Sequence, residues 1–230
     1  MPISIKLTRG ERGGLVGQTG TGKTLLAECN LLPRRGRLAA IDPKRELNFD
    51  APIFEDVGEI IRRRPERYIY RPSPGNIRNY AAYERLYRNI FERGDCFLYT
   101  DEIVVTLRGM EPPEAFLDIY ALGRSRGITC LTATQRPARI PLFLLSECRR
   151  IYAFRVVLPA DKKRMREIIP GYTGQRPPLE EIERFRARYG YTPKVQFAFT
   201  YFNTETEETR LGILEDPKKC LSRHREIRSA

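Results

Sequence analysis

Short apolar segments alternate with longer amphipathic segments along the first two thirds of the chain. The apolar segments predict strands that end at Val16 and that cover residues 38–41, 68–70, 96–100 and 128–134. Between them the spacing of apolar residues predicts helices at residues 23–30, 76–93 and 113–124. Strands that alternate with helices are typical of a mostly parallel sheet flanked by crossover helices, so the pattern predicts an α/β fold.

The pattern changes after residue 150. We predict a strand at residues 151–157, helices at 161–169 and 179–189, and an antiparallel pair formed by residues 195–202 and 210–214. No segment has the composition of a strong linker. We therefore predict a single domain over residues 1–230, in which residues 1–157 form a nucleotide-binding core and residues 158–230 a C-terminal extension with no assigned role.

The strongest motif lies between the first predicted strand and the helix that follows it. It fits the P-loop (Walker A) pattern GxxxxGK[ST] in full, with Gly17, Gln18, Thr19, Gly20, Thr21, Gly22, Lys23 and Thr24. Glycines let backbone N–H groups turn towards phosphates, and the helix N-terminus adds a positive dipole. We expect Lys23 to reach the β- and γ-phosphates and the Thr24 hydroxyl to ligate Mg²⁺. A glycine-rich turn without a ligand is the alternative, and the flanking strand and helix disfavour it.

A second motif supplies the acids that a P-loop needs at the end of another strand. Phe97-Leu98-Tyr99-Thr100 is followed by Asp101 and Glu102. We expect Asp101 to hold Mg²⁺, through water, and Glu102 to polarise the attacking water, which is a Walker B arrangement. The alternative is a strand that merely ends in solvated acids. Most small-molecule P-loop kinases do not need this glutamate, so its presence favours an ATPase.

A third strand also ends in polar residues, in the sequence Leu131-Thr132-Ala133-Thr134-Gln135-Arg136-Pro137. Such residues face the nucleotide crevice when they lie at the carboxyl ends of parallel strands. We expect Gln135 to hydrogen-bond the γ-phosphate or its water and so to report whether the phosphate is present. The alternative is a glutamine in a turn that Pro137 sets.

Taken together, these motifs resemble the FtsK–HerA superfamily of DNA-pumping ATPases over residues 14–141. The resemblance also rests on Ile41-Asp42-Pro43-Lys44 and on Gly123-Arg124-Ser125-Arg126-Gly127-Ile128 running into Thr134-Gln135-Arg136-Pro137. It implies a RecA-like P-loop NTPase fold with ATP as the nucleotide. Within the superfamily, the compact chain resembles the genome-packaging ATPases of internal-membrane double-stranded DNA viruses.

The resemblance further implies a homo-oligomeric ring, a hexamer, with each nucleotide at a subunit boundary. Arg124 aligns with the superfamily arginine that reaches across this boundary to the neighbour's γ-phosphate. A guanidinium delivered in trans stabilises transition-state charge and is worth ~10³–10⁵ in rate in comparable hydrolases. Arg126 and Arg136 are alternatives for this role.

The charge balance favours a polyanionic partner. Lys and Arg total 41 against 29 Asp and Glu, which gives a formal net charge of +12. A basic bias of the whole proteome is the alternative. The densest clusters are Arg62-Arg63-Arg64, Arg34-Arg35 with Arg37, and Lys162-Lys163-Arg164; Arg108-Gly109 lies in a loop just beyond Asp101–Glu102. The sequence assigns no single one of these residues to DNA.

These observations lead to the hypothesis of an ATP-driven motor that packages double-stranded viral DNA into a preformed capsid, with a capsid vertex or viral membrane protein as a further partner. Alternatives are a plasmid or cellular DNA-pumping ATPase, a small-molecule kinase, and a DNA-binding protein without turnover. No window reaches the ~18 apolar residues of a membrane helix, and the N-terminus lacks a signal-peptide pattern. We therefore expect a soluble protein in the host cytoplasm, at the virion vertex, or both.

Overall fold

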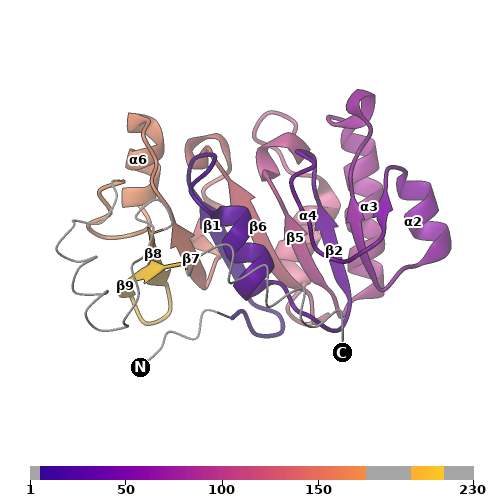
Figure 1. Cartoon of the computed structure of the whole chain (residues 1–230), viewed down its shortest axis with the longest axis horizontal. Helices are drawn as coiled ribbons and strands as arrows, with labels where there is room; N and C mark the ends of the chain where they lie inside the picture. The colour runs from indigo at the N-terminus through magenta and orange to yellow at the C-terminus, as the bar shows by residue number, and fades with distance from the viewer. Residues whose placement is uncertain (1–5, 175–197, 215–230) are drawn as a thin grey trace.

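A central sheet organises the chain (Figure 1). The computed structural model describes residues 6–174 and 198–214, and within these ranges nine strands lie in the order β3-β4-β2-β5-β6-β1-β7-β8-β9. Their bounds are β1 Arg12–Val16, β2 Leu38–Ile41, β3 Ile53–Phe54, β4 Arg67–Tyr70, β5 Phe97–Thr100, β6 Thr129–Thr134, β7 Arg150–Ala153, β8 Ala198–Asn203 and β9 Glu208–Ile213. Strands β1 to β7 pair in parallel, and β8 and β9 continue the sheet antiparallel. The predicted α/β fold with an antiparallel C-terminal pair is confirmed.

Helices cover both faces of the sheet. They are α1 Lys23–Leu26, which continues as the π-helical turn η1 Ala27–Leu31, and α2 Val57–Arg63, α3 Tyr80–Arg93, α4 Glu114–Leu122, α5 Phe143–Ser146 and α6 Pro159–Arg166. Short 3₁₀ turns are η2 Pro74–Asn76, η3 Ile103–Thr106 and η4 Pro137–Arg139. Among the described residues, no helix combines the length and apolar character that a bilayer crossing requires.

The buried strands supply two separate cores because successive side chains of a strand point to opposite faces. Leu15 packs with α1 on one face, whereas Val16 packs with α3 and α4 on the other. On α3 the buried residues are Tyr83, Leu86, Tyr87 and Ile90, which recur at the expected helical spacing. The helical periodicity therefore identified the correct face of α3.

Some predicted boundaries were wrong. The helix predicted from residue 76 begins at Tyr80, because the chain first forms η2 and the Asn79 side chain then caps α3 by accepting a hydrogen bond from Ala82 N. The strand predicted at 151–157 ends at Ala153, and the next two residues contact the P-loop region, since Phe154 N donates to the Val16 carbonyl and Gln18 N to the Arg155 carbonyl. The helix predicted at 161–169 is α6, which starts earlier because Pro159 is suited to a first helical turn. Residues 179–189 and 195–197 lie outside the described part of the chain.

Two elements of the segment between β2 and β4 were not predicted. Helix α2 begins at a capping aspartate, Asp56, whose carboxylate accepts hydrogen bonds from Gly58 N and Glu59 N. The two-residue strand β3 is the outermost strand on one side of the sheet and pairs with β4. Both are short, and a strand of two residues leaves no periodicity to detect.

The carboxyl ends of β1, β2, β5 and β6 meet at one edge of the sheet, at the top in Figure 1. We call this the carboxyl edge and the opposite one the amino edge. Residues that follow these four strands directly are Gly17, Asp42, Asp101 and Gln135. The four polar motifs of the sequence therefore converge at one edge.

Candidate functional site

The P-loop connects the carboxyl end of β1 to α1. Gly17 has φ +152° and lies so close to Phe154 that an added Cβ would come within 2.5 Å of the Phe154 Cβ. Gly22 caps α1 in a left-handed conformation, with φ +105°. Any side chain at either glycine would be strained. Neighbouring strand ends hold the loop, because Gly17 N donates to the Thr134 carbonyl (3.1 Å) and Gln18 N to the Arg155 carbonyl (3.1 Å).

Lys23 is folded back into this loop. Its Nζ donates to the carbonyls of Gly17 (2.7 Å) and Gln18 (2.9 Å), and the residue is only 5% exposed. Burial, followed by the nearby Lys44 ammonium, lowers the pKa of Lys23 to about 8, although Asp101 and Glu102 act in the opposite direction. The Lys23 ammonium therefore lies in the same electrostatic environment as the two acids that follow β5.

Asp101 is fully buried, and its two carboxylate oxygens differ in their surroundings. Oδ1 accepts a hydrogen bond from the Tyr99 hydroxyl (2.9 Å). Oδ2 has no hydrogen-bond partner among the described residues and lies 3.4 Å from Lys44 Nζ. A carboxylate oxygen and a threonine hydroxyl are hard ligands of the kind that Mg²⁺ prefers. Asp101 and Thr24, in the first turn of α1, thus fit the magnesium ligation that the sequence predicts.

Glu102 is held in place by the neighbouring strand. Its backbone is left-handed, with φ 62°, which is uncommon for a residue other than glycine. The carboxylate accepts hydrogen bonds from Gln135 N (3.2 Å to each oxygen) and from the Thr134 hydroxyl (3.2 Å). Non-glycine residues in such conformations cluster at functional sites, where surrounding contacts hold them. These contacts fix the direction in which the Glu102 side chain points.

Lys44 is a residue of the site to which the sequence assigned no role. Its Nζ lies 3.4 Å from both Asp101 Oδ2 and Glu102 Oε2. Burial alone would lower the pKa of Lys44, but Asp101, Glu102 and Glu46 outweigh that effect and raise it. Lys44 therefore provides positive charge to the carboxylates from a third strand end, that of β2.

The turn that presents Lys44 is built around Asp42. This buried carboxylate accepts hydrogen bonds from Glu46 N (3.0 Å) and Leu47 N (3.1 Å) and forms an ion pair with Arg71 Nε (2.8 Å). The Ile41-Asp42-Pro43-Lys44 motif was a visible signal in the sequence. Its function could not be derived, because the partners of Lys44 come from a distant part of the chain.

Gln135 contacts the P-loop and Glu102 at the same time. Its side-chain Oε1 accepts a hydrogen bond from the Thr19 hydroxyl (2.9 Å), while its backbone N donates to Glu102. The structure therefore brings together Lys23, Asp101, Glu102 and Gln135, as well as the unpredicted Lys44. This arrangement can bind phosphate oxygens and orient a water molecule next to them.

Arg124 is not part of this cluster. It is exposed at the end of α4 and packs near Gly10, at the amino edge, and among the described residues its side chain has no hydrogen-bond or ion-pair partner. The two alternative arginines are engaged: Arg126 donates to the carbonyls of Phe91 (2.7 Å) and Glu92 (2.8 Å), and Arg136 pairs with Asp161 (3.0 Å). Arg124 can therefore reach a nucleotide only if that nucleotide belongs to another copy of the chain.

The parallel core strands, with the P-loop directly after β1, define the fold of P-loop nucleoside triphosphatases. Solved structures with a similar fold include the genome packaging NTPase B204 from Sulfolobus turreted icosahedral virus 2. Its complex with AMP has a TM-score of 0.62 at 15% identity and covers 90% of this chain and 98% of that chain. Its complex with ATP-gammaS has a TM-score of 0.60 at 14% identity and covers 87% and 95%.

A second similar structure is that of EccC ATPases 2 and 3 from Thermomonospora curvata in complex with a signal sequence peptide. The TM-score is 0.52 at 13% identity, over 90% of this chain and 37% of that chain. No protein-family model and no curated protein sequence matches the chain. At these identities the likeness is one of fold, and in fold the chain resembles genome-packaging NTPases, as its motifs implied.

Proposed function

We propose that this chain is an ATPase in which Glu102 activates water and residues 17–24 bind the phosphates. The observation that carries this proposal is the orientation of Glu102 by Gln135 N and the Thr134 hydroxyl, beside the P-loop. A glutamate held in this way is directed at a defined position, as a general base must be. Most small-molecule P-loop kinases do not need this glutamate, so its presence favours hydrolysis.

Each residue of the cluster then has a role. The backbone N–H groups of the loop and Lys23 hold the phosphates, and Thr24 and Asp101 hold Mg²⁺. The metal ion, when bound, neutralises charge on the phosphate oxygens. Glu102 accepts the proton of the attacking water, and Gln135, hydrogen-bonded to Thr19, responds to loss of the γ-phosphate.

The transition-state arginine is Arg124 of a neighbouring copy. Its position at the amino edge supports this assignment, because the strands separate Arg124 from the P-loop of its own chain and leave its side chain available to another copy. The hexameric state comes from the resemblance to the FtsK–HerA superfamily. A guanidinium that is absent from the isolated site and supplied by the next copy makes hydrolysis depend on assembly.

The motor that we propose moves double-stranded DNA, most simply into a viral capsid. The net charge of +12 and the similarity in fold to a genome packaging NTPase support a DNA substrate. A capsid vertex or viral membrane protein would complete the assembly, in the host cytoplasm or at the virion vertex. A plasmid or cellular DNA-pumping ATPase shares the same chemistry and remains the alternative function.

Release of free phosphate by the purified protein, with and without long duplex DNA, tests this function. We expect turnover that depends on Mg²⁺ and that DNA stimulates. Turnover that is indifferent to DNA would contradict a DNA motor. Transfer of the phosphate to a small molecule, with no free phosphate, would instead identify a kinase.

A further inference from the structure

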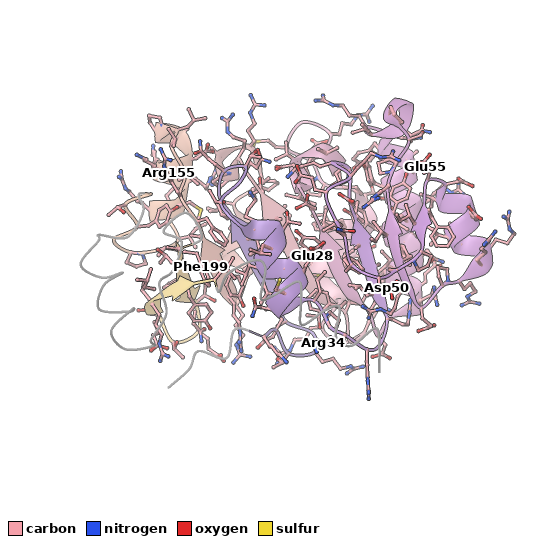
Figure 2. The ribbon with its side chains drawn as sticks, in the orientation of Figure 1. Glu28, Arg34, Asp50, Glu55, Arg155 and Phe199 are labelled. Carbon is pink, nitrogen blue, oxygen red and sulfur yellow. The ribbon has the colours of Figure 1, made fainter. Side chains whose placement is uncertain are left out.

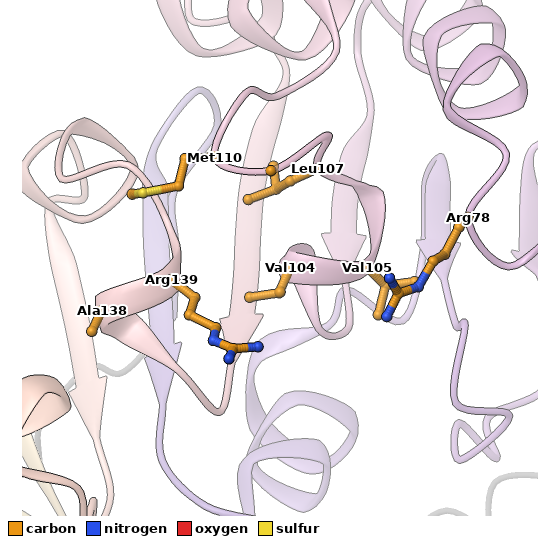
Figure 3. Close-up of a pocket in the computed structure, with 8 residues that line it drawn as sticks. Arg78, Val104, Val105, Leu107, Met110, Ala138 and Arg139 are labelled. Carbon is orange, nitrogen blue, oxygen red and sulfur yellow. The ribbon is translucent and has the colours of Figure 1, made fainter.

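A groove opens at the carboxyl edge, just beyond Asp101 and Glu102 (Figure 3). It consists of two adjoining cavities, of about 380 and about 410 Å³, which share Arg78 and Leu107. Figure 3 shows the residues that line the first of them. The floor is apolar and is formed mainly by Val104, Val105, Leu107 and Met110. Arginines from three separate segments line the two cavities, namely Arg78, Arg108 and Arg139. We call these three arginines and the apolar floor between them the basic groove.

The three arginines are exposed. Among the described residues, none of their guanidinium groups forms an ion pair or a hydrogen bond; Arg108 lies over the Tyr80 ring, with 5.9 Å between the guanidinium carbon and the ring centroid. Figure 3 shows the Arg78 and Arg139 side chains on opposite sides of Val104 and Val105. Unpaired guanidinium groups that surround an open groove favour an anionic ligand.

A tight turn presents Arg108 at a fixed position. Arg108 N donates to the Glu111 carbonyl (2.9 Å) and Glu111 N donates back to the Arg108 carbonyl (3.1 Å), while Gly109 has φ +66°. Met110, at the tip of the turn, is 48% exposed. The turn therefore presents a cation and an apolar side chain together, and the carboxylates of Glu84, Glu111 and Glu114 lie near the Tyr80 ring that Arg108 covers.

Two of the segments that line the groove continue directly from the nucleotide site. The 3₁₀ turn η3, which carries Val104 and Val105, begins after Glu102, and Val105 N donates to the Glu102 carbonyl (3.0 Å). The turn η4, which carries Arg139, begins two residues after Gln135. A change in the position of Glu102 or Gln135 would thus be transmitted to the groove through very few residues.

We propose that the basic groove binds the phosphate backbone of duplex DNA. This inference rests on the proposed function and specifies which residues of the motor hold its substrate. Guanidinium groups bind phosphate oxygens in a bidentate manner, and contacts of this kind position a duplex without reading its sequence. The groove is open and its three cations come from separate segments, so it fits an extended, repeating anion better than one small phosphate ester.

Equilibrium binding of a fluorescent duplex over a range of salt concentrations tests the proposal. The groove variant is Arg78→Gln/Arg139→Gln, and the matched control is Arg34→Gln/Arg35→Gln, which removes the same charge from exposed residues at the opposite edge. Figure 2 shows Arg34 at that edge. We expect the groove variant to weaken binding by on the order of tenfold or more. The slope of log K against log salt should fall by roughly 2, about 0.9 for each lost phosphate contact.

The control variant should bind as the wild type does, and Arg78→Lys/Arg139→Lys should retain most of the salt slope because it keeps both charges. Thermal unfolding checks that each variant is folded, and the single substitutions replace the double one if it is not. If the groove and control variants bind DNA equally well, the proposal that the basic groove binds DNA is wrong, while the proposed DNA motor is unaffected. A wild-type protein that does not bind duplex DNA would overturn both proposals.

Discussion

Charged side chains have different partners at the carboxyl edge and at the amino edge of the sheet. At the carboxyl edge, the carboxylates of Asp42, Asp101 and Glu102 are buried among strand ends and are paired with Arg71 or Lys44. At the amino edge, several guanidinium groups donate to backbone carbonyls, and others pair with carboxylates that are at least partly exposed, such as Asp95 and Glu66.

Several arginines of the amino edge stabilise the ends of helices. Arg126 donates to the Phe91 and Glu92 carbonyls in the last turn of α3, and Arg37 donates to the carbonyls of Arg93, its last residue, and of Gly94, its C-cap. Arg12 donates to the Tyr120 carbonyl near the end of α4. Cations suit these positions, because the final carbonyls of a helix lack partners and carry its negative dipole end. Part of the positive charge therefore has a structural use, whereas the side chain of Arg124 has no hydrogen-bond or ion-pair partner among the described residues.

The largest expected effect comes from replacing Arg124. Arg124→Ala should lower the rate of hydrolysis by ~10³–10⁵, because the arginine of the neighbouring copy stabilises transition-state charge. Steady-state phosphate release measures this rate, under conditions in which the wild type assembles. A loss of only a few-fold would show that Arg124 is an ordinary surface residue.

Glu102→Gln should lower turnover by ~10²–10⁴, which is the usual contribution of a positioned general base. Glutamine retains the shape of the side chain but cannot take the proton from water. Binding of a fluorescent ATP analogue should persist, since the P-loop does not depend on this carboxylate. A Gln variant with wild-type turnover would place the base elsewhere.

Lys44→Met tests whether the Lys44 ammonium stabilises the buried carboxylates of Asp101 and Glu102. The substitution removes the ammonium that lies 3.4 Å from both Asp101 and Glu102, so the free energy of unfolding should fall by roughly 1–3 kcal/mol, less than for a fully buried pair. Lys44→Arg, which keeps the charge, should lose less. Urea denaturation measures both variants, and a Met variant as stable as the wild type would contradict the role of Lys44.

Arg126→Ala should have the smallest effect. It removes two hydrogen bonds to the end of α3 and the contact with the Phe91 ring, at a cost of about 1–2 kcal/mol of stability. Thermal unfolding detects this loss. If turnover instead fell as steeply as in Arg124→Ala, the transition-state arginine would be Arg126.

The sequence predicted those parts of the fold and site whose signal is local. The P-loop, Asp101–Glu102 and Gln135 each follow a buried strand directly, so the strand pattern located them at one edge. The helix face from Tyr83 to Ile90 was equally clear, because its periodicity extends over several turns. These features depend on neighbouring residues along the chain.

The remaining features depend on residues that are distant in sequence. Lys44 gains its role from carboxylates that follow β5, and Gly17 is constrained by Phe154, which follows β7. Net charge alone could not separate arginines that stabilise helix ends, such as Arg126, from those that line the basic groove, such as Arg139. The spacing of residues along the chain does not indicate these long-range contacts.

The most direct test of the account is to mix two variants, Glu102→Gln and Arg124→Ala, each of which should be nearly inactive alone. In randomly mixed rings about a quarter of the boundaries would join an intact Glu102 of one copy to an intact Arg124 of the next. We predict that phosphate release by the mixture rises far above the sum of the two separate variants. A mixture no more active than that sum would contradict a site shared between the two edges of neighbouring copies.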